Sequence, residues 1–468
     1  MIIEIINRFY NEKVEDFSTR VLYFFNTIDT YFFIAGLSSF FLYKKGFDFN
    51  IFFLLMISAS IILIFKLADF YPLFLLFTPA YLYFLFKSQS ISFSGAGLLL
   101  LINMGIFVLI QFLFMGIPDS IVARDPTIGI RKIWNSIFTI APTTVSISMS
   151  VCFSTLYSLI LVVSPTLLSL NGLLFWLTIC TAALVTFYFK PKTFVSASFK
   201  PEIIEKIAEK VVVLNIDGCR LDRFYEAGLP FLTSLQKESS YFPLGLQTVY
   251  RALTNPAFAS ILTGTVPHVH RVKNNNLGQS IKVEALPDIV KTKLYGSMHV
   301  KHFSKAHWNT RIVSLPTLGI YKSDDIVFDW LKEDLLTDDG TRLFVVDLSE
   351  TDFLGHAYGS ESDEYLEAIK RADERIEKFF ERIKKYNLFE STVIIICSDH
   401  GIVRIDHSYL LFKAERLVPF MITGKRIKAN NPLRFKASIM DITPTISYLL
   451  GVKYPDSCKG RVFIEALE

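Results

Sequence analysis

The sequence predicts a multi-span α-helical membrane region followed by an α/β domain with a doubly wound, mostly parallel sheet. Three observations predict this fold class. Only 20 of the 92 charged residues fall in the first 190 positions of the 468-residue chain, and all eight histidines lie beyond them. Apolar runs of bilayer-spanning length fill that first part. In the second part, apolar strands alternate with an amphipathic helix.

The composition excludes several classes of protein. The chain is 51% hydrophobic, with a mean hydropathy of +0.39. It is too apolar for an ordinary soluble protein and too charged for a pure membrane bundle. A net charge of +4 is near neutral at this length, so we expect no nucleic acid as a structural partner. The five cysteines lack C-x-x-C spacing and indicate neither a disulfide framework nor a cysteine zinc site.

The first 190 residues predict a lipid bilayer as a partner. The candidate spans are residues 21–43, 48–65, 71–86, 93–115, 144–164 and 168–189. The second and third runs are short, so both five and six spans are compatible with the sequence. With six spans the positive-inside rule places the second domain in the cytoplasm. With five spans and a cytoplasmic N-terminus, the domain lies outside.

Residues 191–209 are expected to be a linker, and residues 210–468 a single α/β domain. We expect buried strands at 211–216, 343–346 and 393–397, because these runs are apolar and rich in β-branched residues. A helix is expected at 361–385, with Tyr365, Ile369, Ala372, Ile376, Phe379 and Ile383 on one face. A strand–helix–strand order predicts a doubly wound sheet, whose ligands bind at the carboxyl ends of the strands.

Acidic residues and histidines follow each predicted strand. The first strand ends at Asp217-Gly218; the second at Asp347, followed by Glu350, Asp352 and His356; the third at Ser398-Asp399-His400-Gly401. Any one of these is weak evidence, because Asp-Gly after a strand usually forms a turn. Together, carboxylates and imidazoles at one edge of a sheet predict a divalent-metal site.

These motifs resemble a known family. The matching set is Asp217-Gly218, Thr254-Asn255-Pro256 with Gly264, Asp352-Phe353-Leu354-Gly355-His356, Ser398-Asp399-His400-Gly401, and a final stretch from Met440 to Gly451. It resembles the type I phosphodiesterase/nucleotide pyrophosphatase branch of the alkaline phosphatase superfamily. Residues 345–358 also resemble the glycosylphosphatidylinositol ethanolamine-phosphate transferases. The similarity spans about residues 210–455 and implies an alkaline-phosphatase-like domain.

The resemblance implies two divalent metal ions, commonly zinc, with Mn²⁺ or Mg²⁺ as alternatives. One ion would be held by Asp217, Thr254, Asp399 and His400, and the other by Asp352, His356 and a late histidine. Only His407 follows His400 in this chain, so it takes the last position.

The resemblance also implies that Thr254 is a nucleophile that forms a phospho-threonine intermediate, and that Asn275 contacts a phosphate oxygen. The alternatives are a helix N-cap for Thr254 and a polar turn for Asn275. For His268, His270, His299, His302 and His307 we favour exposed or hydrogen-bonded side chains over metal ligands. Surface roles are favoured for Arg220 and Lys273.

The sequence therefore predicts a membrane-embedded, metal-dependent phosphodiesterase or phospho-headgroup transferase that acts on a lipid-linked phosphodiester. One alternative is a hydrolase of soluble nucleotide or pyrophosphate diesters that is merely anchored to a membrane. Another is an inactive metal-binding membrane protein. Because multi-span relatives that modify lipids usually work outside the cytoplasm, we favour an extracytoplasmic catalytic domain.

Overall fold

The computed structural model describes residues 170–273, 275, 279–314, 318–337, 339–404, 407, 410 and 412–468, with six isolated residues between 94 and 105. The described residues fall into two compact units. One comprises residues 191–468, and the other includes the helix α7 (Leu170–Phe189).

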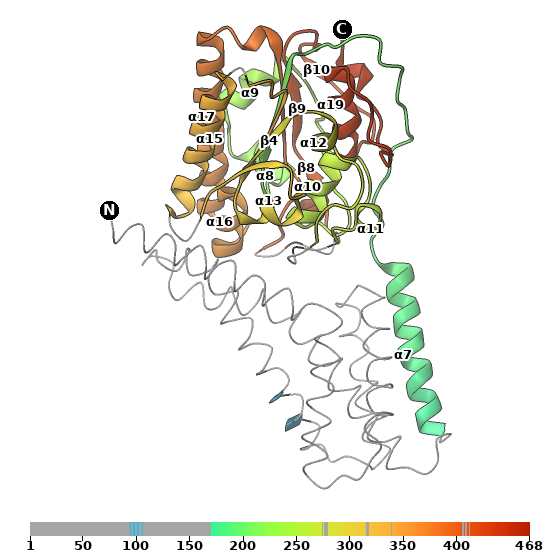
Figure 1. Ribbon diagram of the computed structural model, residues 1–468. Coiled ribbons are helices and arrows are strands. Elements are labelled where there is room, and N and C mark those ends of the chain that lie inside the picture. Colours follow the sequence, from blue (N-terminus) through green and yellow to red (C-terminus); the bar gives the residue numbers. More distant parts are fainter. Residues whose placement is uncertain are drawn as a thin grey trace. The chain divides into compact units, whose positions relative to one another are not determined.

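Most of the predicted membrane region lies outside the described residues. Helix α7 coincides with the sixth apolar run, residues 168–189, and is drawn in Figure 1. Within the part of the chain that the structure describes, we find no helix whose length and apolar character would let it cross a membrane. The membrane spans therefore stay a prediction.

The unit that comprises residues 191–468, the α/β unit, contains short strands and helices of very different lengths. The strands are β1 (Lys210–Ile216), β2 (Ser239–Tyr241), β3 (Leu246–Gln247), β4 (Thr292–Gly296), β5 (Asn309–Ile312), β6 (Leu343–Leu348), β7 (Thr392–Cys397), β8 (Leu417–Val418), β9 (Phe420–Thr423) and β10 (Asn431–Pro432). The helices are α8 (Leu221–Glu226), α9 (Pro230–Gln236), α10 (Thr254–Thr263), α11 (Pro267–His270), α12 (Leu286–Ile289), α13 (Met298–Phe303), α15 (Ile320–Leu335), α16 (Glu350–Tyr358), α17 (Asp363–Lys385), α18 (Lys413–Arg416) and α19 (Ile442–Leu450). Single 3₁₀ turns occur at Phe389–Ser391, Ile439–Asp441 and Ile464–Ala466.

The main sheet confirms the predicted doubly wound, mostly parallel α/β architecture. Its strand order is β10-β2-β9-β7-β1-β6-β4-β5. Strands β7, β1, β6, β4 and β5 pair in parallel, whereas β9 is antiparallel to both β7 and β2. Asn215 of β1 pairs with Asp347 of β6 and with Cys397 of β7. The three central strands therefore end level with one another, which brings their carboxyl-terminal residues together.

Helices cover both faces of the sheet because side chains alternate along each strand. Val211 and Val213 of β1 face a core shared with α10, α12, α13 and α19. Val212, Leu214 and Ile216 face the opposite core, shared with α8, α9, α15 and α17. Figure 1 shows α15 and α17 side by side along one side of this unit. Burial on both faces explains why β1 is apolar without alternation.

The predicted elements agree with the structure to within two residues at each end. The six apolar residues of the predicted helix at 361–385 are all buried in α17. That helix begins at Asp363 rather than at residue 361, because the Ser362 hydroxyl accepts a hydrogen bond from the Tyr365 N–H at 3.2 Å and caps it. The polar string after Asp347 forms a helix, α16, which the strand pattern did not predict.

The segment expected to be a linker, residues 191–209, packs against the rest of the α/β unit. The Thr193 hydroxyl accepts from the Tyr250 N–H at 2.8 Å, and the Ser196 hydroxyl donates to Asp441 at 2.5 Å. The N–H groups of Ile207 and Ala208 both donate to the Leu449 carbonyl. These contacts extend over the whole segment, so it is bound to the domain and does not act as a free spacer.

Candidate metal centre

The carboxyl ends of the central strands deliver the predicted ligands to one place. Asp217 follows β1, Asp399 and His400 follow β7, and α16, which follows β6, carries Asp352. Asp217, Asp399 and His400 are at most 2% exposed. Parallel strands that end level meet at one edge of the sheet, so residues more than 180 positions apart become neighbours.

Asp217, Asp399 and His400 form the first group, and their ligand atoms lie within 4.8 Å of one another. His400 Nε2 lies 3.4 Å from an oxygen of Asp217 and 3.4 Å from an oxygen of Asp399. The Thr254 hydroxyl lies 3.2 Å from the same nitrogen. The structure thus brings together all four residues assigned to the first ion.

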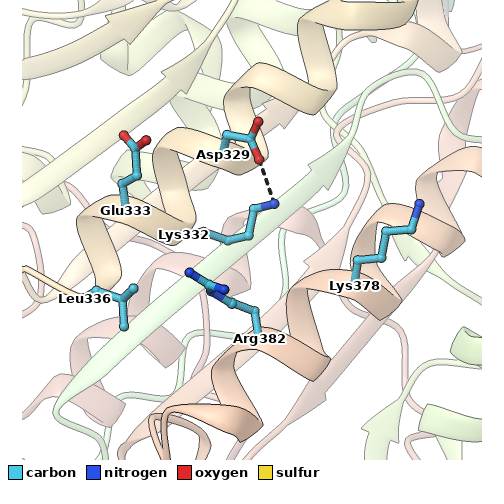
Figure 2. Close-up of a pocket in the computed structure, with 6 residues that line it drawn as sticks. All are labelled: Asp329, Lys332, Glu333, Leu336, Lys378 and Arg382. Atoms are coloured by element: carbon cyan, nitrogen blue, oxygen red, sulfur yellow. Dashed lines mark ion pairs between the residues drawn. The ribbon is translucent and has the colours of Figure 1, made fainter.

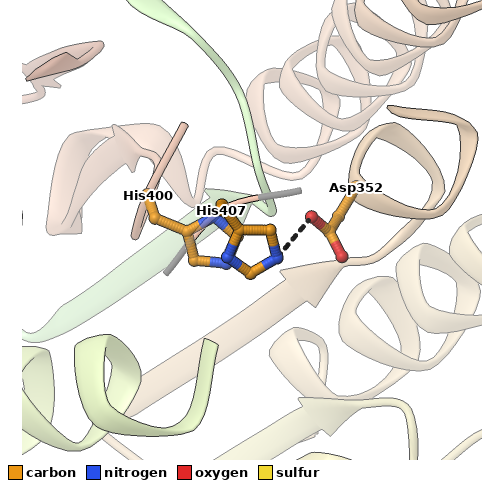
Figure 3. Close-up of side chains that lie close together, drawn as sticks. All are labelled: Asp352, His400 and His407. Atoms are coloured by element: carbon orange, nitrogen blue, oxygen red, sulfur yellow. Dashed lines mark ion pairs between the residues drawn. The ribbon is translucent and has the colours of Figure 1, made fainter. Parts of the chain in front are cut away.

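Asp352, His356 and His407 form the second group. Asp352 lies 3.3 Å from His356 Nε2 and 3.5 Å from His407 Nε2, and the two Nε2 atoms are 3.0 Å apart. Figure 3 shows His407 between Asp352 and His400. The rings of His400 and His407 stack with centroids 3.8 Å apart, so the two groups adjoin. One ligand atom from each of Asp352, His400 and His407 also lies within 4.8 Å of the other two.

The donor set fits divalent cations. Asp217 Oδ1, Asp352 Oδ1 and Asp399 Oδ2 are buried and have no hydrogen-bond donor. A buried carboxylate oxygen without a partner is costly unless a cation compensates it. Mixed carboxylate and imidazole ligands suit zinc and similar ions. The seven residues therefore fit a metal centre; their assignment as ligands stays a prediction.

The electrostatics of the centre also favour bound cations. Burial, followed by the charges of Asp399 and Asp352, raises the pKa of Asp217 well above its ordinary value. Burial, followed by the charges of Asp347 and Asp352, raises the pKa of Asp399 to about 8. Burial opposes ionisation of Asp352 too, but the charges of His356 and His407 outweigh it and lower its pKa. Without cations, the carboxylates of the first group thus tend to retain protons.

Burial lowers the pKa of His400 to about 4. Its imidazole is therefore neutral at physiological pH, which is the protonation state that ligates a metal. The opposite nitrogen, Nδ1, lies 3.2 Å from the Gly401 carbonyl, and His407 Nδ1 lies 2.6 Å from the Ala252 carbonyl. These backbone partners orient both rings with Nε2 toward the carboxylates.

Thr254 begins α10, and the N-cap residue is Leu253. The alternative interpretation of Thr254 as the N-cap is therefore off by one position, and no side chain caps this helix. The Thr254 hydroxyl instead lies near His400, and the side chain is 5% exposed. Its position combines a hydroxyl beside the metal-ligand group with the positive end of a helix dipole.

Asn275 is held next to this helix. Its side-chain oxygen accepts a hydrogen bond from the Asn255 N–H at 2.9 Å. Asn275 is exposed although Asn255 is 1% exposed. Asn275 thus contacts the residue that follows Thr254 in the chain, while its role in phosphate binding stays a prediction.

Sequence reasoning missed a third group, which consists of Asp217, His299 and Asp347. His299 Nε2 lies 2.9 Å from Asp347 Oδ2, and Asp347 also accepts hydrogen bonds from Asn215 and Ser349. Asp347 follows a predicted strand, and its position at the strand end was a signal in the sequence for a residue of the centre. His299 comes from α13, after β4, a strand that the sequence did not predict, so nothing indicated that it reaches the centre.

The burial of Arg220 and His270 tests what the sequence analysis expected of each. Arg220 is 7% exposed and bonds with Asp222, Ser360 and Glu361, so its expected surface role is wrong. His270 is buried against the Ser260 hydroxyl at 3.0 Å, as expected for a hydrogen-bonded histidine.

A surface pocket of about 360 Å³ lies between α15 and α17. It is lined by Asp329, Lys332, Glu333, Leu336, Lys378 and Arg382, shown in Figure 2. Lys332 pairs with Asp329 at 2.7 Å. The pocket contains none of the predicted site residues.

The family model for type I phosphodiesterase / nucleotide pyrophosphatase matches residues 211–284 and 297–453. The chain belongs to this family. The match covers every residue of the two ligand groups and the region around Thr254, and it confirms the resemblance based on the short motifs. The α/β domain is accordingly of the alkaline phosphatase type.

Curated members of this phosphodiesterase family and its relatives align over the same region. An uncharacterized pyrophosphatase/phosphodiesterase of Schizosaccharomyces pombe is 25% identical over 228 residues, which cover 43% of this chain and 46% of that protein. Ectonucleotide pyrophosphatase/phosphodiesterase family member 1 of Homo sapiens is 26% identical over 220 residues, 41% of this chain and 23% of that protein. Lipoteichoic acid synthase 2 of Bacillus subtilis is 28% identical over 127 residues, 24% of this chain and 19% of that protein. The chain thus spans less than half the length of each.

Proposed function

We propose that the chain is a metal-dependent phosphodiesterase or phospho-headgroup transferase that acts on a lipid-linked phosphodiester through a phospho-threonine intermediate. The observation that carries the proposal is the position of the Thr254 hydroxyl, 3.2 Å from His400 in a cluster of three buried aspartates and three histidines. Family membership supports diester chemistry.

Two divalent cations would be held by Asp217, Thr254, Asp399 and His400 on one side and by Asp352, His356 and His407 on the other. When bound, they supply charge neutralisation for the phosphate and lower the pKa of the hydroxyl that attacks it. Zinc is the proposed ion because both groups mix carboxylates with histidine nitrogens.

The residues of this chain then divide the work. Thr254 attacks phosphorus, so that a threonine–phosphorus bond forms while the bond from phosphorus to the leaving alcohol breaks and the alcohol takes up a proton. The N-terminus of α10 directs N–H groups at the phosphate. With its oxygen engaged by Asn255, Asn275 presents its amide nitrogen as a donor to a phosphate oxygen. Water or an acceptor alcohol attacks the phospho-threonine in the second step and regenerates the hydroxyl.

A lipid-linked substrate is proposed from the architecture. The first 190 residues predict several membrane spans, and a single anchor would suffice merely to hold a hydrolase at a membrane. The partial similarity to a lipoteichoic acid synthase also favours a lipid-linked donor. The similarity to an ectonucleotide pyrophosphatase/phosphodiesterase supports the second candidate, hydrolysis of soluble nucleotide diesters.

The test compares the two substrate classes on the chain purified in detergent with zinc. We expect faster cleavage of diesters from total membrane lipids than of soluble nucleotide diesters, with products identified by mass spectrometry. Equal or faster cleavage of the nucleotides would reject the lipid-linked substrate. Reactions with an added acceptor alcohol distinguish transfer from hydrolysis, because only transfer yields a phosphodiester product that carries the acceptor.

Thr254→Ala is the matched test of the chemistry. It should abolish turnover while zinc stays bound, because Asp217, Asp399 and His400 remain. Thr254→Ser keeps a hydroxyl and should retain activity. If neither the parent chain nor any variant turns over a diester, the inactive metal-binding protein becomes the better description.

We further propose that the catalytic domain faces away from the cytoplasm, which follows from a five-span count with a cytoplasmic N-terminus. Cys458 is buried and therefore unsuitable for labelling. Leu244 is 73% exposed, so Leu244→Cys offers an accessible thiol. An impermeant maleimide should label this variant in intact cells above the parent's background; labelling only after lysis would reverse the orientation.

A further inference from the structure

The helix that carries half of the second ligand group begins without a cap of its own. α16 (Glu350–Tyr358) holds Asp352 and His356 one helical turn apart. Its N-cap is Ser349, a residue type that usually caps a helix with its own hydroxyl. Here the Ser349 hydroxyl donates to Asp347 at 3.0 Å, and no side-chain cap bond forms. The first N–H groups of α16 therefore need another acceptor.

Asp324 of α15 is that acceptor. Its Oδ1 accepts from the Ser349 N–H at 3.1 Å, and its Oδ2 accepts from the Glu350 N–H at 3.2 Å. Asp324 is 2% exposed and lies 25 residues before Ser349, the N-cap residue of the helix that it caps. A carboxylate at this position also interacts favourably with the positive end of the helix dipole.

Two arginines of α17 form ion pairs with acidic residues that meet at the start of α16. Arg375 contacts Glu350 at 2.5 Å and lies 3.9 Å from Asp324, and Arg371 contacts Glu350 at 2.5 Å. Glu350 is 1% exposed, so its charge is compensated by these arginines and not by water. Three helices, α15, α16 and α17, thus meet at the first turn of α16.

We propose that Asp324 is a positioning residue for the second metal ion: by capping α16 from a neighbouring helix, it sets where Asp352 and His356 present their ligand atoms. The inference rests on the proposed metal centre and adds a residue to it that lies outside the ligand set. Asp352 is only two residues beyond Glu350, so a shift of the first turn moves its carboxylate directly. Metal sites tolerate ligand displacements of only about 0.5 Å.

The test measures zinc bound to the 468-residue chain at buffered free zinc concentrations, counted by elemental mass spectrometry. Asp324→Asn keeps the shape but replaces one acceptor oxygen by an NH₂ group that faces a backbone N–H. We expect the affinity for the second ion to fall about 10- to 100-fold, as when groups that orient metal ligands are removed. The first ion should bind as in the parent chain. Turnover at limiting zinc should fall, and saturating zinc should restore it.

Asp334→Asn is the matched control on the same helix. Asp334 lies near the other end of α15 and accepts hydrogen bonds from Lys293, Tyr295 and Arg311 at 2.8–2.9 Å. Its replacement should lower the melting temperature without changing either zinc affinity. A purely structural role for Asp324 predicts that both variants behave alike.

The outcomes separate the two proposals. Unchanged affinity for the second ion in Asp324→Asn, or an equal loss in Asp334→Asn, overturns the positioning role. If Asp324→Asn does not fold, Asp324→Glu replaces it, because it keeps the negative charge beside Arg375 but moves the acceptor oxygens away from the N–H groups of Ser349 and Glu350. Parental binding of the second ion by that variant would also reject the inference. A parent chain that binds fewer than two ions refutes the metal centre itself, and the positioning role with it.

Discussion

Gly218→Ala should separate the two ligand groups. Gly218 follows Asp217 and has φ of 68°, in the left-handed region that L side chains rarely adopt. A Cβ at this position would lie 2.6 Å from Asp352 Oδ1 and 3.0 Å from Asp352 Cα. The residue after a first-group ligand thus packs directly against a second-group ligand.

The size of the effect follows from these distances. Ordinary Cβ contacts begin at 3.4 Å, so the backbone of Asp352 must move by about 0.4 Å and its carboxylate by about 0.8 Å. The latter exceeds the positional tolerance of about 0.5 Å for a metal site. We expect the second zinc ion to bind about 10- to 100-fold more weakly. The left-handed backbone conformation costs a further roughly 1–2 kcal/mol of folding stability.

Gly228→Ala is the control for the backbone cost. Gly228 has φ of 63°, and a Cβ there would meet no atom within 4 Å. This variant should lose about 1–2 kcal/mol in denaturant unfolding, from the same conformational cost, and keep both zinc ions. Zinc affinities are measured by elemental mass spectrometry at buffered free zinc. If Gly218→Ala binds the second ion as tightly as Gly228→Ala does, the close contact with Asp352 does not limit the site.

Three further predictions follow from buried groups. Burial raises the pKa of Asp399 to about 8, so the folded metal-free chain holds a proton there that the unfolded chain releases near 3.8. As the pH rises from about 4 to about 8, Asp399 therefore lowers the free energy of unfolding of the metal-free chain by about 1.4 kcal/mol per pH unit. Denaturant titrations at several pH values should show a smaller dependence of this free energy on pH in Asp399→Asn. An equal dependence in both chains would contradict the raised pKa of Asp399. Burial lowers the pKa of His270 to about 3. Below about pH 6.5 the imidazole is therefore protonated in the unfolded chain but stays neutral in the folded chain. The parent should lose more stability than His270→Gln as the pH falls from 6.5 to 4, and parallel curves would argue against a buried neutral imidazole. Ser196→Ala removes the 2.5 Å bond to Asp441; the change should cost about 1 kcal/mol locally and speed proteolysis within residues 191–209, whereas an unchanged cleavage rate would show that this bond does not hold the segment.

Several elements could be read from the sequence because their cause is local. β1, β6 and β7 are apolar and β-branched, and α17 repeats its apolar residues at helical spacing, so each segment signals its own structure. The predicted and observed start of a helix differ where a single side chain caps it. The Ser362 hydroxyl caps α17, which therefore begins two residues later than expected. Such caps depend on where a hydroxyl finds its partner, which spacing alone does not reveal.

By itself, the sequence determined the family, the α/β class and the residue types of the metal centre, because each strand ends in its own acid or histidine. Only the tertiary structure decided how these ends meet. The level register of β1, β6 and β7 brings Asp217, Asp352 and Asp399 to one edge, and α13, which follows β4, adds His299 from a segment without a motif. In the folded chain the Ser349 hydroxyl also donates to Asp347, and Asp324 caps α16 in its place. The contact between Asp324 and α16 joins two helices that lie on either side of β6 in the chain. It forms because burial leaves N–H groups that must find acceptors wherever the packing provides them.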